Sequence, residues 1–126
     1  MYKKNEILHI ALQYNDTKKA DIFFKKILGL KMEREFNISE ELSDKIFGIK
    51  ENIDVKLYGN DDIKFEVFIS KKDKKNNFEH VCIKIGDKEK FIKICKQNNI
   101  EPMYIKKGEK TLLFIRDHSN NLYEIK

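Results

Sequence analysis

The sequence predicts an α+β protein of two β-α-β-β-β modules, whose strands form a curved, mainly antiparallel sheet around a cleft. The first observation is a repeat: segments 9–16 and 80–87 each begin with His, carry apolar residues at their second, fourth and sixth positions, and end with Asp. The second is that a run with helical spacing of apolar residues follows each segment. The third is that segments 64–67 and 122–125 both contain the order aromatic, Glu, β-branched aliphatic. The chain thus contains one structural unit twice.

In the first half, the alternation over 9–16 is typical of a strand with one buried face, and Asp16 suits a helix N-cap. The following run places on one helical face Ala20, Phe23, Phe24, Ile27 and Leu28, and Gly29 stands where a left-handed C-cap is expected. The first half is about 13 residues longer than the second, and an amphipathic stretch at 38–48 predicts an extra helix there. The expected strands are Leu30–Phe36, Asp54–Tyr58 and Lys64–Ile69.

In the second half, Asp87 precedes a run in which Phe91, Ile94 and Cys95 share one face, and Pro102 lies beyond the helix end. The expected strands are Met103–Ile105, Thr111–Ile115 and Leu122–Ile125. Turn-forming residues at 59–62 and 117–121 predict hairpin loops, and we expect His118, in the latter, at the surface. Together these elements predict a single domain over 1–126, with one module at about 6–70, a linker at 71–77 and a second module at about 78–126.

Composition excludes several classes of protein. No apolar run approaches the ~20 residues that span a membrane, and the first residues do not resemble a signal peptide, so we expect a cytoplasmic protein. The net charge of +5 does not indicate nucleic-acid binding, because only two of the 26 basic residues are Arg and the Lys residues are interleaved with 21 acids along the chain. Cys82 and Cys95 have no CxxC spacing, and we expect buried, reduced thiols.

Four repeated polar residues are the candidate site: His9, Glu66, His80 and Glu124. Each lies on the strand face opposite the aliphatic residues, because successive side chains of a strand point to opposite faces. A carboxylate in a half-apolar strand needs a hydrogen bond, a counter-charge or a metal ion. Taken singly, each could be a hydrogen-bonded core His or a salt-bridged Glu, but as a repeated set they predict a metal-binding cleft. Two imidazoles and two carboxylates suit one divalent ion (Ni, Co, Zn, Mn or Fe), with positions left for substrate.

The repeated pattern, together with Leu28-Gly29-Leu30 and the segment 116–124, resembles the vicinal oxygen chelate superfamily, and glyoxalase I-like members most of all. The resemblance implies that His9, Glu66, His80 and Glu124 are the four metal ligands. It also implies a lyase or isomerase that acts on a small α-oxygenated carbonyl or thioester, by proton transfer through a metal-bound enediolate, with Glu124 or Glu66 as the catalytic base. The alternatives that it leaves open are a non-catalytic small-molecule-binding protein like the bleomycin-resistance proteins and a methylmalonyl-CoA epimerase-like isomerase.

Other features of that superfamily bear on partners and substrate. Its members commonly form dimers, so the resemblance implies a homodimer that binds a small-molecule substrate. Bacterial glyoxalases often carry Arg and Asn to hold glutathione where this chain has Gln13 and Ser70. The substrate is therefore expected to be another compound, and an acidic group on it is expected to meet Lys84 or Lys106.

Overall fold

The computed structural model describes residues 5–73 and 75–126, and it confirms the α+β class with two β-α-β-β-β modules. In chain order the elements are β1 (Ile10–Tyr14), α1 (Thr17–Asp21), η1 (Ile22–Ile27), β2 (Lys31–Ile38), α2 (Glu40–Phe47), β3 (Ile53–Gly59), β4 (Lys64–Ile69), β5 (Val81–Ile83), α3 (Lys88–Gln97), β6 (Met103–Lys107), β7 (Lys110–Arg116) and β8 (Leu122–Ile125). In the described ranges, every helix is too short or too polar to cross a bilayer.

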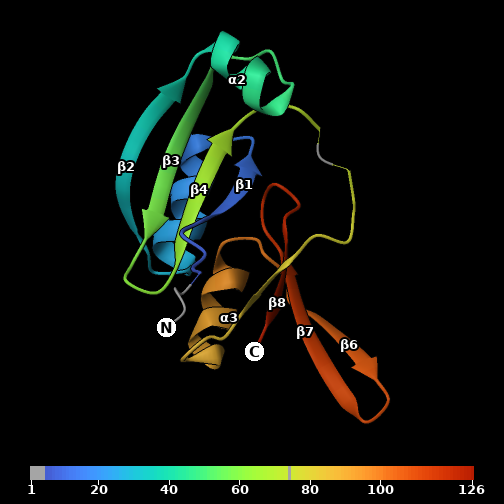
Figure 1. Ribbon diagram of the computed structural model, residues 1–126. Helices are drawn as coiled ribbons and strands as arrows, with labels where there is room; N and C mark the ends of the chain where they lie inside the picture. The colour runs from blue at the N-terminus through green and yellow to red at the C-terminus, as the bar shows by residue number, and fades with distance from the viewer. Residues whose placement is uncertain (1–4, 74) are drawn as a thin grey trace, which may run out of the picture.

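The strands form two four-stranded sheets, one for each module. Sheet A has the order β1-β4-β3-β2 and sheet B the order β5-β8-β7-β6. In each sheet the first strand pairs parallel with the last, and the other neighbours are antiparallel. Figure 1 shows the two sheets with β2 and β6 at their outer edges. This identical topology confirms the duplication inferred from the sequence.

The helix boundaries follow from local hydrogen bonds. The carboxylates of Asp16 and Asp87 accept the backbone N–H groups of Lys19 at 3.0 Å and Lys90 at 3.1 Å, which makes both Asp residues N-caps. Gly29 adopts φ +72°, as expected of a left-handed residue after the first helix. These signals of helix start and end are confirmed.

The first helix changes its hydrogen-bond pattern after one turn. From Ile22 to Ile27 it is a π-helix, and its end is marked by the Leu28 N–H, which donates to the carbonyl of Phe23 at 2.9 Å. A π-turn is wider than an α-turn and shifts the direction of the side chains around it. Within this segment the neighbouring residues Phe23 and Phe24 are both fully buried.

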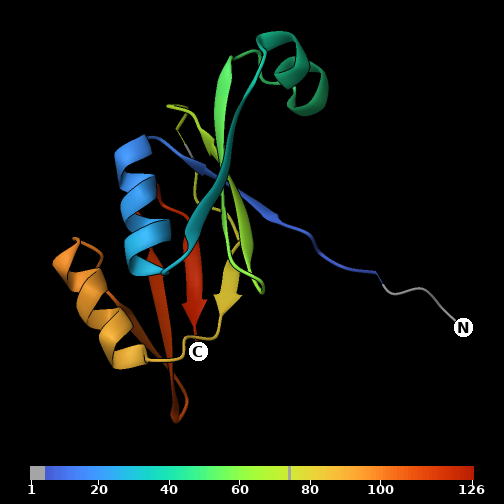
Figure 2. The ribbon, with the colours of Figure 1, turned by 90° about the vertical axis from the view of Figure 1, so that its left-hand side faces the viewer.

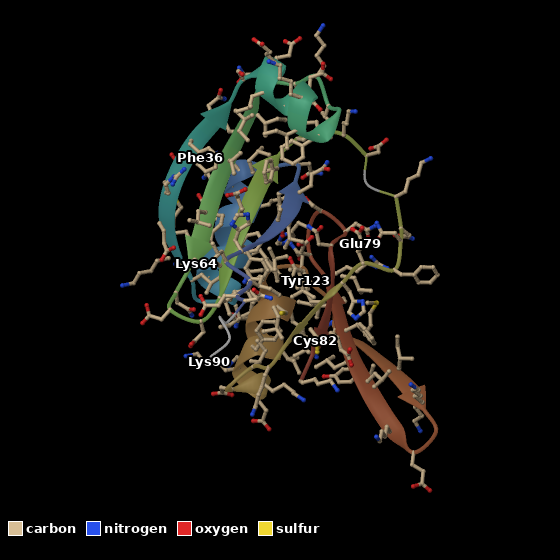
Figure 3. All side chains as sticks on the ribbon, in the orientation of Figure 1. Phe36, Lys64, Glu79, Cys82, Lys90 and Tyr123 are labelled. Atoms are coloured by element: carbon tan, nitrogen blue, oxygen red, sulfur yellow. The ribbon has the colours of Figure 1, made fainter. Side chains whose placement is uncertain are left out.

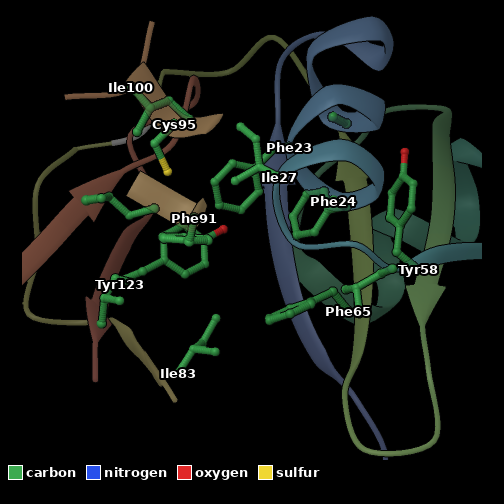
Figure 4. Packing of buried hydrophobic residues seen from close by; sticks show 14 of the residues in the cluster. Phe23, Phe24, Ile27, Tyr58, Phe65, Ile83, Phe91, Cys95, Ile100 and Tyr123 are labelled. Atoms are coloured by element: carbon green, nitrogen blue, oxygen red, sulfur yellow. The ribbon is translucent and has the colours of Figure 1, made fainter. Parts of the chain in front are cut away.

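These two phenylalanines join one core between the two sheets. The ring of Phe23 lies 5.0 Å from that of Tyr123 in sheet B, whereas Phe24 lies 5.0 Å from Tyr58 and 5.4 Å from Phe65 in sheet A. Figure 4 shows Phe23 directed toward Tyr123 and Phe91, and Phe24 directed toward Tyr58 and Phe65. Such aromatic contacts stabilise a core beyond the area that they bury. The π-helix therefore holds the two modules together.

The helices leave one side of each sheet largely uncovered. Figure 2 shows α1, η1 and α3 on one side of the sheets, while the N-terminal segment extends away from the other side. We call this other side the open face. On sheet A, α2 covers only one end of the open face, where Phe47 packs on Phe68 with ring centroids 5.3 Å apart.

Candidate functional site

The first His–Glu pair is assembled on the open face of sheet A. Glu66 pairs with Ala11 across the parallel β1–β4 ladder. Because His9 precedes Ala11 by two residues, the side chains of His9 and Glu66 share one face of the sheet. The Nε2 atom of His9 lies 3.5 Å from Oε1 of Glu66. The side chains are 45% and 20% exposed, respectively, so solvent reaches both. An imidazole and a carboxylate, 57 positions apart in the sequence, thus lie in contact and accessible to a ligand.

The second pair occupies the same places on sheet B. Glu124 pairs with Cys82 across the parallel β5–β8 ladder, and His80 directly precedes β5. The His80 ring nitrogen Nδ1 lies 3.0 Å from the carbonyl oxygen of Phe78. Since a carbonyl only accepts hydrogen bonds, Nδ1 carries the proton, and in the neutral ring Nε2 keeps its lone pair. This is the tautomer that metal-binding His residues use when the other nitrogen is hydrogen-bonded.

The carboxylate of Glu124 has a cation beside it. Its Oε2 atom lies 3.8 Å from Nζ of Lys126, and its side chain is 19% exposed. His80 has an aromatic neighbour on the same sheet, Phe114, whose ring centroid is 6.5 Å from that of His80. On sheet B, His80 therefore has an aromatic neighbour and Glu124 a cationic one.

The two pairs remain separate in a single chain. Among residues 5–73 and 75–126, no three side chains of His, Cys, Asp or Glu gather in a way that could hold a metal ion. The structure brings His9 to Glu66, and it does not bring this pair to His80 and Glu124 within one chain. The four-residue metal site stays a prediction.

Two clefts adjoin the candidate residues. The larger, of about 800 Å³, lies between the N-terminal segment, the β3–β4 turn and β5, and its lining includes His9, Lys64, Cys82 and Lys84. The smaller, of about 290 Å³, lies between β1 and the segment 79–81 and includes His80 in its lining. Each candidate His therefore borders a space in which a small molecule fits.

The structure corrects the prediction for Cys82. Its side chain is exposed, because Cys82 lies on the open face, where no helix covers it. Glu124 is its partner on the neighbouring strand and shares that face. Figure 3 shows Cys82 on the second half of the molecule. The prediction for Cys95 is confirmed, since this residue is buried and burial raises the pKa of its thiol to about 11. Strand alternation places Cys82 on the same face as His80, and on this uncovered face the general tendency of free Cys to be buried does not apply.

The structure also corrects the prediction for His118, which joins the two modules instead of lying free at the surface. Its Nε2 atom lies 2.9 Å from the carbonyl oxygen of Asn98, and its Nδ1 lies 3.3 Å from the hydroxyl of Tyr14. In the same loop, Asp117 is buried and accepts a hydrogen bond from the Tyr123 hydroxyl at 2.7 Å. Burial raises the pKa of Asp117, although the donors around it oppose that shift. Turn composition alone does not reveal such contacts between distant segments.

Comparisons with known proteins agree with the fold. No curated protein matches the chain in sequence. A glyoxalase family protein from Enterococcus faecalis has a TM-score of 0.70 and 19% identity, with 95% of this chain and 95% of that chain covered. Glyoxalase I from Leishmania major, described as trypanothione-dependent, has a TM-score of 0.71 and 13% identity, with 97% and 86% covered.

A third solved structure contains a metal ion and an organic ligand. It is a Glu-to-Gln variant of the fosfomycin resistance protein FosX from Listeria monocytogenes, complexed with Mn(II) and a dihydroxypropylphosphonic acid. Its TM-score is 0.71 and its identity to this chain is 15%, with 98% of this chain and 92% of that chain covered.

The family comparison agrees with the vicinal oxygen chelate resemblance seen in the sequence. The model of the Glyoxalase/Bleomycin resistance protein/Dioxygenase superfamily matches residues 8–114, which is most of the chain and includes His9, Glu66 and His80. The chain therefore belongs to the Glyoxalase/Bleomycin resistance protein/Dioxygenase superfamily.

Proposed function

We propose that the protein is a metal-dependent, glyoxalase-like lyase or isomerase that acts on a small α-oxygenated carbonyl or thioester. The observation that carries this proposal is the contact of His9 with Glu66 at 3.5 Å on an open face, repeated in placement by His80 and Glu124. A structural neighbour that contains Mn(II) supports a metal-dependent reaction on this fold.

The proposed ligands fit a divalent ion by their chemistry. Imidazole nitrogen and carboxylate oxygen are borderline to hard donors, and two carboxylates balance the charge of the ion. His80 already has the protonated Nδ1 that leaves Nε2 available. When bound, the ion would draw electron density from the substrate oxygens and so make the neighbouring C–H group more acidic.

The chain itself supplies the proton transfer. A carboxylate of Glu66 or Glu124 takes the proton from the carbon next to the carbonyl and returns it to the adjacent carbon, so that no external oxidant or reductant is needed. Both carboxylates are about one-fifth exposed, which lets each reach a substrate at the open face.

We further propose that the site is completed in a homodimer, in which His9 and Glu66 of one chain face His80 and Glu124 of a second copy. Apolar side chains beside both His residues are highly exposed: Ile7 is 86% exposed, Leu8 74% and Phe78 99%. Exposed apolar side chains grouped beside a site are typical of interaction surfaces. A second copy that covered them would bring together the open faces of a sheet A and a sheet B.

Elemental analysis tests the metal. The purified protein is expected to carry about one divalent ion per chain and to lose it in Glu66→Gln and Glu124→Gln, because each variant removes a charged ligand. The exposed Glu40→Gln variant, in α2, serves as control and should keep the metal. Wild-type protein that folds as a dimer and binds a small molecule but no metal would instead indicate a non-catalytic binding protein.

A mixing experiment tests the shared site. One variant lacks the first pair (His9→Ala with Glu66→Gln) and the other lacks the second (His80→Ala with Glu124→Gln). Neither should bind metal alone, whereas refolding them together should give about one ion for every four chains, because random pairing makes half of the dimers mixed, with one intact site each. Each variant refolded alone is the control. No recovery in mixtures that form mixed dimers would contradict a site shared between chains.

A further inference from the structure

Two lysines lie side by side on the open face of sheet B. The backbone N–H of Lys126 donates to the carbonyl of Ile83 at 2.9 Å, and its carbonyl accepts from the N–H of Ile85 at 2.8 Å. This is the parallel ladder pattern that places Lys126 directly opposite Lys84. Ile83 and Ile125 are 6% and 3% exposed on the helix side, so the alternation directs Lys84 and Lys126 to the open face.

The two lysines adjoin the candidate metal ligands. Cys82 and Glu124 precede them by two residues on the same face, a step of about 7 Å along a strand. The Lys126 Nζ atom reaches to 3.8 Å from Oε2 of Glu124. Lys84 also lines the cleft of about 800 Å³ that contains His9. Two ammonium groups therefore stand at the edge of the proposed site.

The corresponding places of sheet A carry no charge. They are occupied by Gln13 and Phe68, which are opposite each other in the β1–β4 ladder. The Gln13 side chain donates to the carbonyl of Lys72 at 2.7 Å, and Phe68 packs against Phe47 of α2. Sheet A thus uses these positions to hold neighbouring segments, whereas sheet B uses them to present cations.

Among the described ion pairs, one carboxylate, that of Glu124, contacts this lysine pair. Within residues 5–73 and 75–126, Lys84 forms no ion pair with a side-chain carboxylate. Lys126 forms one, with Glu124, and at 3.8 Å it is the longest of the ion pairs described. Like charges directly opposite each other on a sheet are unfavourable, and an anion bound between them relieves this repulsion.

We infer that Lys84 and Lys126 bind an oxyanion group of the substrate, a carboxylate, a phosphate or a phosphonate, and so select anionic substrates. The assignment of that anion to a substrate rests on the proposed function. The binding of the oxyanion itself rests only on the lysine pair and its surroundings.

The test measures binding of inorganic phosphate and of acetate to the protein as purified, by titration calorimetry. The double variant Lys84→Gln with Lys126→Gln should weaken binding of the preferred probe about tenfold, which is about 1.4 kcal/mol, because it removes both ammonium–anion contacts. The matched control is Lys107→Gln with Lys110→Gln, which removes the same charge from another cross-strand lysine pair of sheet B. Control affinity should stay within about twofold of wild type. The tighter probe identifies the charge and shape of the natural group.

The results separate this inference from the proposed function. Equal weakening in the two double variants, or no weakening in the first, would overturn the anion site even if the protein proves to be a metal enzyme. A metal-free protein whose phosphate or acetate affinity depends on Lys84 and Lys126 would retain the anion site and refute the enzymatic proposal.

Discussion

The hydroxyl of Tyr14 on β1 lies 3.3 Å from Nδ1 of His118 and accepts the backbone N–H of the same residue at 3.2 Å. Because Nε2 of His118 donates to the carbonyl of Asn98, neutral His118 has Nδ1 free to accept the hydroxyl proton of Tyr14. Burial raises the pKa of Tyr14, which keeps this hydroxyl protonated as the donor. One phenol therefore ties the first strand of sheet A to the β7–β8 loop of sheet B.

Replacing Tyr14 with Phe should lower the free energy of unfolding by about 1–3 kcal/mol, because the His118 N–H loses its acceptor in a partly buried place. Urea denaturation measures this. The control is Tyr104→Phe, since Tyr104 is 59% exposed and its hydroxyl makes no hydrogen bond within the described residues. Equal midpoints for Tyr14→Phe and wild type would show that the contact contributes nothing to stability.

The carboxylate of Asp21 should make stability depend on acid. Burial acts to raise the pKa of Asp21, but hydrogen bonds from Tyr58 and Lys56 outweigh burial and leave the pKa below its ordinary value of 3.8. A carboxyl with a lowered pKa in the folded state stabilises the protein above its unfolded pKa, and this contribution is lost as the pH falls through the folded value. Asp21→Asn should therefore destabilise the protein at pH 6 more than at about pH 2–3.

Unfolding free energies of the wild type and Asp21→Asn at these two pH values provide the measurement. Asp44→Asn is the matched control, because Asp44 is exposed in α2 and its side chain makes no ion pair within the described residues. A destabilisation by Asp21→Asn that is the same at both pH values would contradict the linkage.

The two thiols should react differently with an aromatic disulfide reagent at pH 8. Cys82 is exposed and should react quickly, whereas Cys95 is buried with a pKa of about 11 and should stay protected. We expect one reactive thiol in the native protein and two after denaturation. Cys82→Ser should leave no rapidly reacting thiol, and rapid reaction of Cys95 in that variant would disprove its burial.

Alternation and turn residues predicted most of the sheets. The strands Lys64–Ile69 and Leu122–Ile125 have the expected bounds, because each is short, follows a run of turn formers and carries an exposed-side Glu between two residues of the buried face. The strand expected within 80–87 is shorter than the alternating pattern, because β5 comprises only Val81–Ile83. Beyond Ile83, the backbone of Lys126 still forms hydrogen bonds with Ile83 and Ile85. The π-helix was not expected, because the apolar spacing from Ala20 to Ile27 fits an α-helix equally well.

The sequence predicts which candidate residues share a strand face, but not how the two sheets are placed relative to each other. The face shared by His9 and Glu66 follows from alternation and from parallel pairing, and the structure brings their side chains into contact. Whether two sheets approach each other depends on packing, which a single sequence does not encode in any local pattern. Likewise, the burial of Lys56 beside Asp21 depends on where a helix lies over the sheet.

The placement of Phe23 and Phe24 on two different aromatic clusters bears on how the protein denatures. If sheet B loosens, Phe23 loses its contact with Tyr123, and if sheet A loosens, the adjacent Phe24 loses its contact with Tyr58. Because the two Phe residues are neighbours on one helix, a change in either sheet disturbs the packing of the other. We therefore expect the two halves to melt as one cooperative unit, so that neither would persist as an autonomous fragment if the backbone were cut between them.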